Sequence, residues 1–139
     1  MRIIEVKTKK HIKDFVRLPQ RLHQQNACYV PPIWLDENNG YTKRNNPILA
    51  NSDFVMHLLY DKENNPIGRN LVYIDHSHND FYHSKIGFFG AFECIDDKEA
   101  FKTLMDAAQC WLKQRGMETI RGPIHPVAEN WGFVYDGYQ

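Results

Sequence analysis

The sequence has no excess of charge of one sign. Its 17 lysines and arginines balance 17 aspartates and glutamates, which gives a formal net charge of +0 at pH 7. Proteins that bind nucleic acid or an anionic membrane through a broad electrostatic field carry a basic surplus. We therefore expect neither nucleic acid nor a membrane among the partners of this chain.

Paired cysteines and long apolar runs are also lacking. Cys28, Cys94 and Cys110 are far apart and odd in number, which favours free thiols in a reducing compartment over a disulfide framework. The segment from Met1 to Val6 alternates charged residues with short apolar runs, unlike a signal peptide or a membrane span. We expect a cytoplasmic protein, and a length of 139 residues predicts a single domain over residues 1–139.

Signature motifs of common enzyme classes are absent as well. The chain contains no Walker or Rossmann glycine pattern and no Gly-x-Ser-x-Gly nucleophile motif. Metal-type ligands are dense in one stretch only, which contains Asp75, His76, His78, Asp80 and His83. A His-x-His pair on a strand would place both rings on one face, an arrangement that zinc can use. A solvated polar loop explains the same composition, and we predict no metal site.

Strand patterns dominate the middle of the chain. Apolar side chains alternate from Phe54 to Tyr60, and residues 61–66 supply dense turn chemistry. We predict a return strand over residues 67–74, a polar connection over 75–84 and a third strand over 85–95. Glycines inside these strands predict bulges or close backbone approach, and therefore a bent sheet. These glycines are Gly68, Gly87 and Gly90.

The clearest helix follows this sheet. Apolar residues from Phe101 to Leu112 fall on one helical face, Asp96 and Glu99 form a capping-box pattern, and Gly116 occupies the expected position of a C-cap. Residues 117–122 are then predicted to form a short strand.

The N-terminal part is less regular. Residues 3–6 predict a strand, and Thr8 can cap a helix that we expect to end or kink before Pro19, which would give two short helices. Residues 26–52 are rich in Asn, Pro and Gly, which is typical of a long ordered loop or a broken helix.

Four sequence strings carry a family resemblance. They are Lys85-Ile-Gly-Phe-Phe-Gly-Ala-Phe-Glu-Cys, Ala107-Ala-Gln-Cys-Trp-Leu-Lys-Gln-Arg-Gly-Met, Ile120-Arg-Gly-Pro and Val134-Tyr-Asp-Gly-Tyr. Together with the order of elements, they resemble the N-terminal region of a family of long bacterial GNAT-like proteins, which have the acyl-CoA N-acyltransferase fold. The resemblance covers nearly the whole chain and implies an N-terminal part or a shortened form of the longer family pattern.

The resemblance implies a mixed α/β fold. This fold has a central, mostly antiparallel, bent sheet, broken N-terminal helices and one long amphipathic helix between the fourth and fifth strands. The implied activity is transfer of an acyl group from acetyl-CoA or another acyl-CoA to an amine, with no intrinsic cofactor. The implied acceptor is a small-molecule or peptide amine, and a second GNAT-like domain or a homodimer is a possible partner.

One segment departs from the family pattern. GNAT enzymes present a glycine-rich turn to the CoA pyrophosphate at a helix N-terminus, where unpaired N–H groups and the helix dipole attract anions. The equivalent turn here contains no glycine and carries Asp96, Asp97 and Glu99, which would repel a diphosphate. An alternative function therefore stays open, a catalytically silent binding or interaction module with the same fold.

Four residues are candidates for the site. The resemblance implies that Glu93, late on the fourth strand, removes the amine proton, and that Tyr135 protonates the leaving thiolate. Arg121 at the end of the fifth strand is a candidate clamp for an anionic substrate, and Trp34 is a candidate for the wall of an apolar cleft together with Trp131. The structural alternatives are a sheet-edge carboxylate or part of the helix cap for Glu93, packing for Tyr135, a surface ion pair for Arg121, and closure of an exposed core for Trp34 and Trp131.

Overall fold

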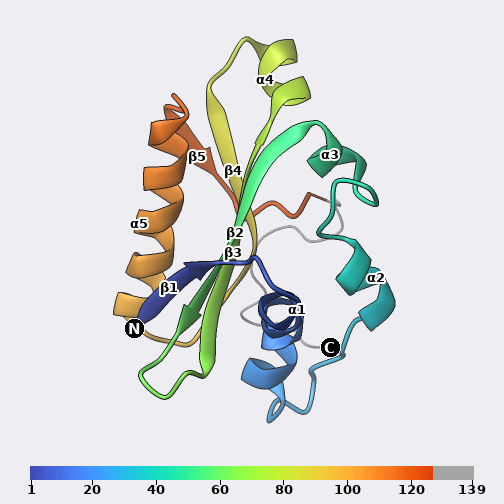
Figure 1. Ribbon diagram of the computed structural model, residues 1–139, viewed down its shortest axis with the longest axis vertical. Helices are drawn as coiled ribbons and strands as arrows, with labels where there is room; N and C mark the ends of the chain where they lie inside the picture. Colours follow the sequence, from blue (N-terminus) through green and yellow to red (C-terminus); the bar gives the residue numbers. More distant parts are fainter. Residues whose placement is uncertain (127–139) are drawn as a thin grey trace.

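A computed structural model of the chain describes residues 1–126 (Figure 1). Its centre is a five-stranded sheet in which the strands follow the order of the sequence. Neighbouring strands are antiparallel except for the last two, which are parallel. The strands are β1 (Arg2–Glu5), β2 (Ser52–Tyr60), β3 (Pro66–Asp75), β4 (Ile86–Cys94) and β5 (Thr119–Arg121). The predicted mixed α/β fold with a mostly antiparallel sheet is confirmed.

Helices cover both faces of this sheet, as Figure 1 shows. They are α1 (Lys9–His23), α2 (Trp34–Asn39), α3 (Pro47–Ala50), α4 (His76–Tyr82) and α5 (Lys98–Gln114). One face packs against α5, where Ala108 and Trp111 meet Val72 and Ile74. The other face packs against α1 to α3 and forms the largest core cluster, which contains Phe15, Val16, Tyr41, Leu49, Leu58, Tyr60, Leu71, Tyr73 and Phe88.

Helix α5 forms where the apolar periodicity predicts it, but its cap is different. The Asp97 carboxylate, not that of Asp96, accepts the N-cap hydrogen bond, at 2.9 Å from the Ala100 nitrogen. Leu104 and Leu112 are buried, whereas Phe101 is half exposed and contacts Phe92 edge to face. The capping-box prediction was therefore wrong by one residue.

Helix α1 continues through Pro19, so the predicted division into two short helices is wrong. A proline inside a helix cannot donate to the carbonyl four residues earlier, here that of Phe15. Arg69 of β3 supplies the missing donor, because its Nη1 lies 2.6 Å from the Phe15 carbonyl oxygen. A contact with the sheet thus compensates for the bond that the proline removes.

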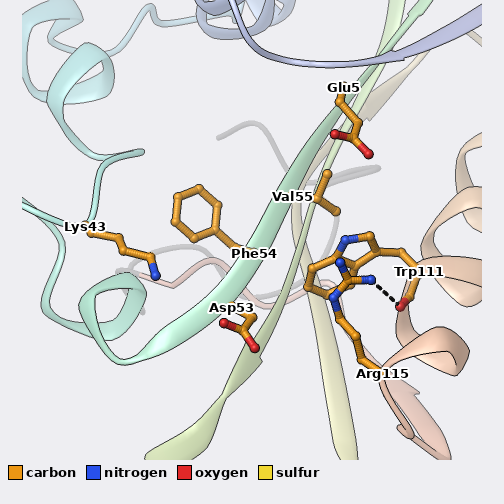
Figure 2. A pocket seen from close by; sticks show the side chains of 7 residues that line it. All are labelled: Glu5, Lys43, Asp53, Phe54, Val55, Trp111 and Arg115. Carbon is orange, nitrogen blue, oxygen red and sulfur yellow. Dashed lines mark hydrogen bonds between the residues drawn. The ribbon is translucent and has the colours of Figure 1, made fainter.

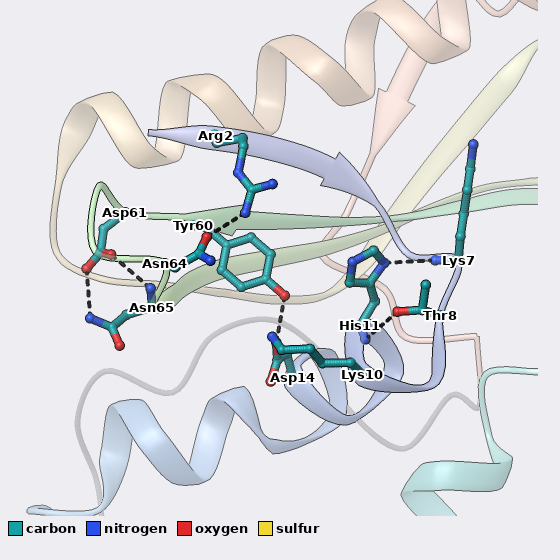
Figure 3. Close-up of polar contacts among 10 residues, drawn as sticks. All are labelled: Arg2, Lys7, Thr8, Lys10, His11, Asp14, Tyr60, Asp61, Asn64 and Asn65. Atoms are coloured by element: carbon teal, nitrogen blue, oxygen red, sulfur yellow. Dashed lines mark hydrogen bonds and ion pairs between the residues drawn. The ribbon is translucent and has the colours of Figure 1, made fainter.

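Polar contacts fix the beginning of α1 against the sheet (Figure 3). The Thr8 hydroxyl accepts from the His11 backbone N–H at 3.1 Å, as predicted for its cap. One turn later, the Tyr60 hydroxyl donates to the Asp14 carboxylate at 2.6 Å. Burial, followed by this bond to Asp14, raises the pKa of Tyr60. The phenol therefore remains a donor and holds α1 on β2.

The polar stretch after β3 was predicted as a loop, but residues 76–82 form the short helix α4. Asp75 caps it by accepting from the His78 N–H, and His83 ends it in a left-handed conformation with φ of +52°. Side chains two residues apart on a helix point in different directions, so the strand geometry behind the His-x-His idea does not occur.

Strand β4 separates from β5 after a short parallel pairing. The two strands pair only over Ile86–Phe88, after which the Ile124 N–H donates to the Phe89 carbonyl at 2.8 Å. At Gly90, a Cβ would lie 2.3 Å from the Ile124 carbonyl oxygen, so only glycine allows this crossing. Within residues 1–126, no strand pairs with the outer edge of β4 beyond this point. Among the same residues, no helix combines the length and apolar character needed to cross a bilayer.

Candidate active site

A bulge shapes the end of β4. Leu71 of β3 pairs with Gly90, but Arg69 pairs with Glu93, so β4 contains one extra residue between these pairs. Ala91 within the bulge has φ of +50°, a left-handed conformation that is unfavourable for residues other than glycine. Bulges of this kind re-aim side chains next to functional sites. The bulge directly precedes Glu93, the residue predicted as the base.

Glu93 meets His23, the last residue of α1. The His23 Nε2 lies 2.8 Å from Glu93 Oε2, and the two side chains are 41% and 28% exposed. The pair is therefore formed by two elements distant in sequence and remains accessible to a substrate. A carboxylate that orients an imidazole is a common arrangement for proton transfer. The predicted position of Glu93, late on the fourth strand, agrees with the structure, but its role as a base stays a prediction.

One tyrosine lies beside this pair, and a second contacts Glu37 and His125. The Tyr29 ring is 5.6 Å from the His23 ring, measured between centroids. The Tyr41 hydroxyl lies 3.2 Å from Glu37 Oε2 and 3.4 Å from His125 Nε2. Burial raises the pKa of Tyr41 to about 12 and also raises that of Tyr29, in each case against the opposing charge of Arg69. Both phenols keep their protons at neutral pH and can donate them.

The other predicted site residues fall elsewhere. Arg121 is exposed and pairs with Phe88, five residues before Glu93 along β4, or roughly 16 Å at the usual rise of a strand. Trp34 begins α2, packs beside the main core and lies under the Arg17 guanidinium at 4.0 Å. Tyr135 and Trp131 lie outside the described residues. Of the three candidate residues that lie within residues 1–126, the structure places only Glu93 in a polar cluster, which it forms with His23.

The N-terminus of α5 bears on binding of an acyl-CoA diphosphate. Asp97 accepts the Ala100 N–H, one of the donors that a phosphate would otherwise use. Asp96, Asp97 and Glu99 are all exposed there. Their charge weakens the attraction of this helix terminus for a phosphate, as the sequence predicts.

No group of three potential metal ligands occurs within residues 1–126. His76 pairs with Asp53 at 3.2 Å, and the His78 ring packs edge to face on Phe88 at 5.0 Å. These contacts account for the two histidines that the sequence singles out.

A separate pocket lies beside the part of β2 that extends past β1. Figure 2 shows this pocket of about 600 Å³, with Phe54 and Val55 of β2 between Lys43 and the Arg115 side chain of the segment after α5. The Arg115 guanidinium stacks on Trp111 at 3.9 Å and donates to the Trp111 carbonyl at 3.1 Å. The pocket contains charges of both signs and does not include Glu93 or His23.

The sequence did not single out three of the residues described above, namely His23, Arg69 and His125. His23 ends a helix that we expected to end or kink before Pro19, so its approach to β4 was not foreseeable. Arg69 did leave a signal, because it is a charged residue within the apolar strand Pro66–Asp75. His125 stands in no motif of the sequence, and its ring contacts that of Tyr41 at 5.8 Å between centroids.

No family model matches the chain. Two curated relatives are each 27% identical to it: "Protein YghO" of Escherichia coli over 136 residues and "Bacterial ceramide synthase" of Caulobacter vibrioides over 138 residues. The alignments cover 94% and 98% of this chain but only 33% and 36% of the relatives. The chain thus spans about a third of the length of the curated relatives that it matches.

A solved structure is also similar. The chain described as "Putative acetyl transferase from Pyrococcus furiosus" matches with a TM-score of 0.55 over 88% of this chain and 84% of that chain, at 16% sequence identity. At this identity, the match establishes the fold alone. The fold of this protein is acetyltransferase-like.

Proposed function

We propose that this chain is a GNAT-type N-acyltransferase, or the N-terminal part of one, which transfers an acyl group from an acyl-CoA to an amine. The contact between His23 and Glu93 beside the β4 bulge carries the proposal. On a sheet of acetyltransferase-like architecture, this pair would supply a proton acceptor on the part of β4 that lies beyond its pairing with β5. Within residues 1–126, no strand pairs with this edge of β4, so its main-chain groups would pair with the amide-containing arm of the acyl-CoA.

The chemistry needs two proton transfers. The amine loses a proton to the Glu93 and His23 pair, and its nitrogen attacks the thioester carbonyl. The C–N bond forms, the C–S bond breaks, and the CoA thiolate leaves and takes a proton. Tyr29 is our candidate for this acid, because its phenol is protonated at neutral pH and lies beside His23. Tyr135, the acid that the resemblance implies, stays a prediction.

A relative's name supports amide formation. Ceramide is the amide of a long-chain amino alcohol, so a ceramide synthase makes the type of bond proposed here. We propose an amine acceptor for this chain and acetyl-CoA or a longer acyl-CoA as co-substrate. The apolar side chains of Val30, Ile33 and Leu35, which are 82%, 70% and 69% exposed near α2, would suit an acceptor with an apolar part.

A second function competes with this one. The Asp97 cap and the acidic start of α5 favour a catalytically silent binding or interaction module, because they weaken the phosphate site that acyl-CoA needs. In that case, the contact between Glu93 and His23 would only hold α1 against β4.

Glu93→Gln separates the two proposals. The purified chain is incubated with acyl-CoA of several chain lengths and a panel of amines, and release of free CoA is measured. We expect Glu93→Gln to lower kcat by about 100-fold or more, with a much smaller change in KM for acyl-CoA, because general acid–base groups contribute that much.

The matched control is Glu63→Gln, which removes an exposed carboxylate from the β2–β3 turn. It is expected to retain full turnover. Equal turnover in Glu93→Gln and the parent chain would remove Glu93 as the base. No CoA release with any amine would favour the binding module.

A further inference from the structure

One side chain touches both elements that carry the candidate pair. Arg69 lies on β3, between α1, which ends in His23, and β4, which carries Glu93. Its Nη1 donates to the Phe15 carbonyl of α1 at 2.6 Å, and its Nε donates to the Ala91 carbonyl of β4 at 2.8 Å. The guanidinium therefore connects the two backbones directly.

Both acceptors are main-chain groups at irregular points. Phe15 has a carbonyl that lacks a helical donor because Pro19 has no N–H. Ala91 is the residue of the bulge with φ of +50°, a conformation that persists only when surrounding contacts enforce it. The planar guanidinium has donors on both sides and can satisfy the two carbonyls together.

Burying the charged guanidinium of Arg69 costs free energy of desolvation, so its retention in the core calls for a local role. The residue is 5% exposed, and no carboxylate among residues 1–126 lies within ion-pair distance of it. The Phe15 ring, 5.0 Å from the guanidinium carbon, offers a further favourable contact. A buried arginine held mainly by two carbonyls is an expensive way to pack a core, because an apolar side chain of similar volume would avoid the cost of desolvation.

We propose that Arg69 is the positioning residue of the site, which holds α1 and the β4 bulge in the relative placement that brings His23 to Glu93. It does not need to touch substrate. The effect of Arg69 on catalysis rests on the proposed function. The contact between His23 and Glu93 that Arg69 holds in place can be measured without activity.

The test compares Arg69→Lys and Arg69→Met with the matched control Arg115→Met. Lysine keeps the charge and the stem but has a single nitrogen, which cannot span both carbonyls as the guanidinium does. Arg115 also stacks on an aromatic ring and donates to a carbonyl, but on the opposite face of the sheet. Circular dichroism establishes which variants are folded.

The readout that does not depend on activity is the ¹⁵N NMR signal of the His23 ring. Glu93→Gln supplies the reference for a His23 without its carboxylate. We expect the His23 signals of Arg69→Lys to move at least halfway toward that reference, and those of Arg115→Met to stay at the parent values. Unmoved His23 signals in folded Arg69→Lys would overturn the proposal, and so would an unfolded Arg69→Lys, because Arg69 would then support the whole fold.

Turnover provides the second readout. If the chain releases CoA, we expect Arg69→Lys to lower kcat by about 10- to 100-fold with a smaller change in KM, as for a misplaced catalytic group. In the Glu93→Gln background, the same substitution should change kcat little, because the group that it positions is gone. Equal losses in both backgrounds would contradict the positioning role. If no CoA is released, the proposed function fails, while the NMR result still decides the placement of His23.

Discussion

At the scale of single residues, buried polar groups divide into those with a partner and those without. Arg69 is buried and satisfied by two carbonyls. His57 and Asn70 are buried opposite one another on β2 and β3, under α5. Within the described residues, neither His57 Nδ1 nor either polar atom of the Asn70 side chain has a hydrogen-bond partner. An unpaired buried polar group costs stability, so His57 is a point of weakness.

The burial of His57 predicts a stability that depends on pH. Burial lowers the pKa of His57 below the ordinary value of 6.5. The unfolded chain therefore binds a proton more readily than the folded chain once the pH falls below about 6.5. The stability that the neutral ring provides is present above this pH and is lost as the pH falls toward the folded pKa. The loss can reach about 1.4 kcal/mol per pH unit.

Urea unfolding at pH 7.5 and pH 5.5 checks this prediction. His57→Leu should reduce the loss of unfolding free energy between the two conditions. The control is His83→Asn, which replaces an exposed histidine at a left-handed position that asparagine also accepts. An acid-induced loss that is the same in His57→Leu and the parent would show that other groups cause it.

The sequence predicts the position of a single residue where that position depends on its neighbours along the chain. The place of Glu93 late on a strand was foreseeable because it follows from the pattern of neighbouring residues, whereas its role came from the resemblance and stays a prediction. His23 was not foreseeable, because its role depends on a contact across 70 residues of sequence. Tyr29 and Tyr41 gain their raised pKa values from burial, which no pattern near them indicates.

At the scale of elements, periodicity predicted β2, β3, β4 and α5 because each has a clear apolar face. It failed at α4, a seven-residue helix with no buried residue and therefore no apolar face to detect. It also failed at Pro19, where the local rule for proline is correct but a donor from β3 replaces the lost bond. Both failures arise because local rules do not contain tertiary contacts.

The cap of α5 gives a prediction at this scale. Asp97→Ala should lower the free energy of unfolding by about 1 kcal/mol, since it removes the N-cap acceptor. Asp97→Ser keeps a capping oxygen and should leave stability nearly unchanged. Because serine removes a negative charge from the helix N-terminus, it should also tighten acyl-CoA binding by about two- to fivefold.

Asp96→Ala is the control for stability, because Asp97, not Asp96, is the N-cap residue. Chemical denaturation measures the first effect, and calorimetric titration measures the second. An Asp97→Ser chain that binds acyl-CoA no more tightly than the parent would show that this helix terminus is not where the diphosphate lies.

At the scale of the whole molecule, fold and activity rest on different observations. The order of strands, the parallel β4–β5 pair and the helices on both faces give an acetyltransferase-like architecture. The bulge, the His23–Glu93 contact and the Arg69 link bring polar groups together on the part of β4 that lies beyond its pairing with β5. The sequence predicted the architecture through its periodicity and its resemblance, but only the folded chain brings the cluster together.

Calorimetric titration of the 139-residue chain with acyl-CoA tests the central claim most directly. An acyltransferase site on this chain predicts one molecule bound per chain with a Kd below about 1 mM, the upper end of ordinary Michaelis constants. Absence of binding heat at millimolar acetyl-CoA and longer acyl-CoA, at two temperatures, would contradict the claim that the chain is a self-sufficient acyltransferase.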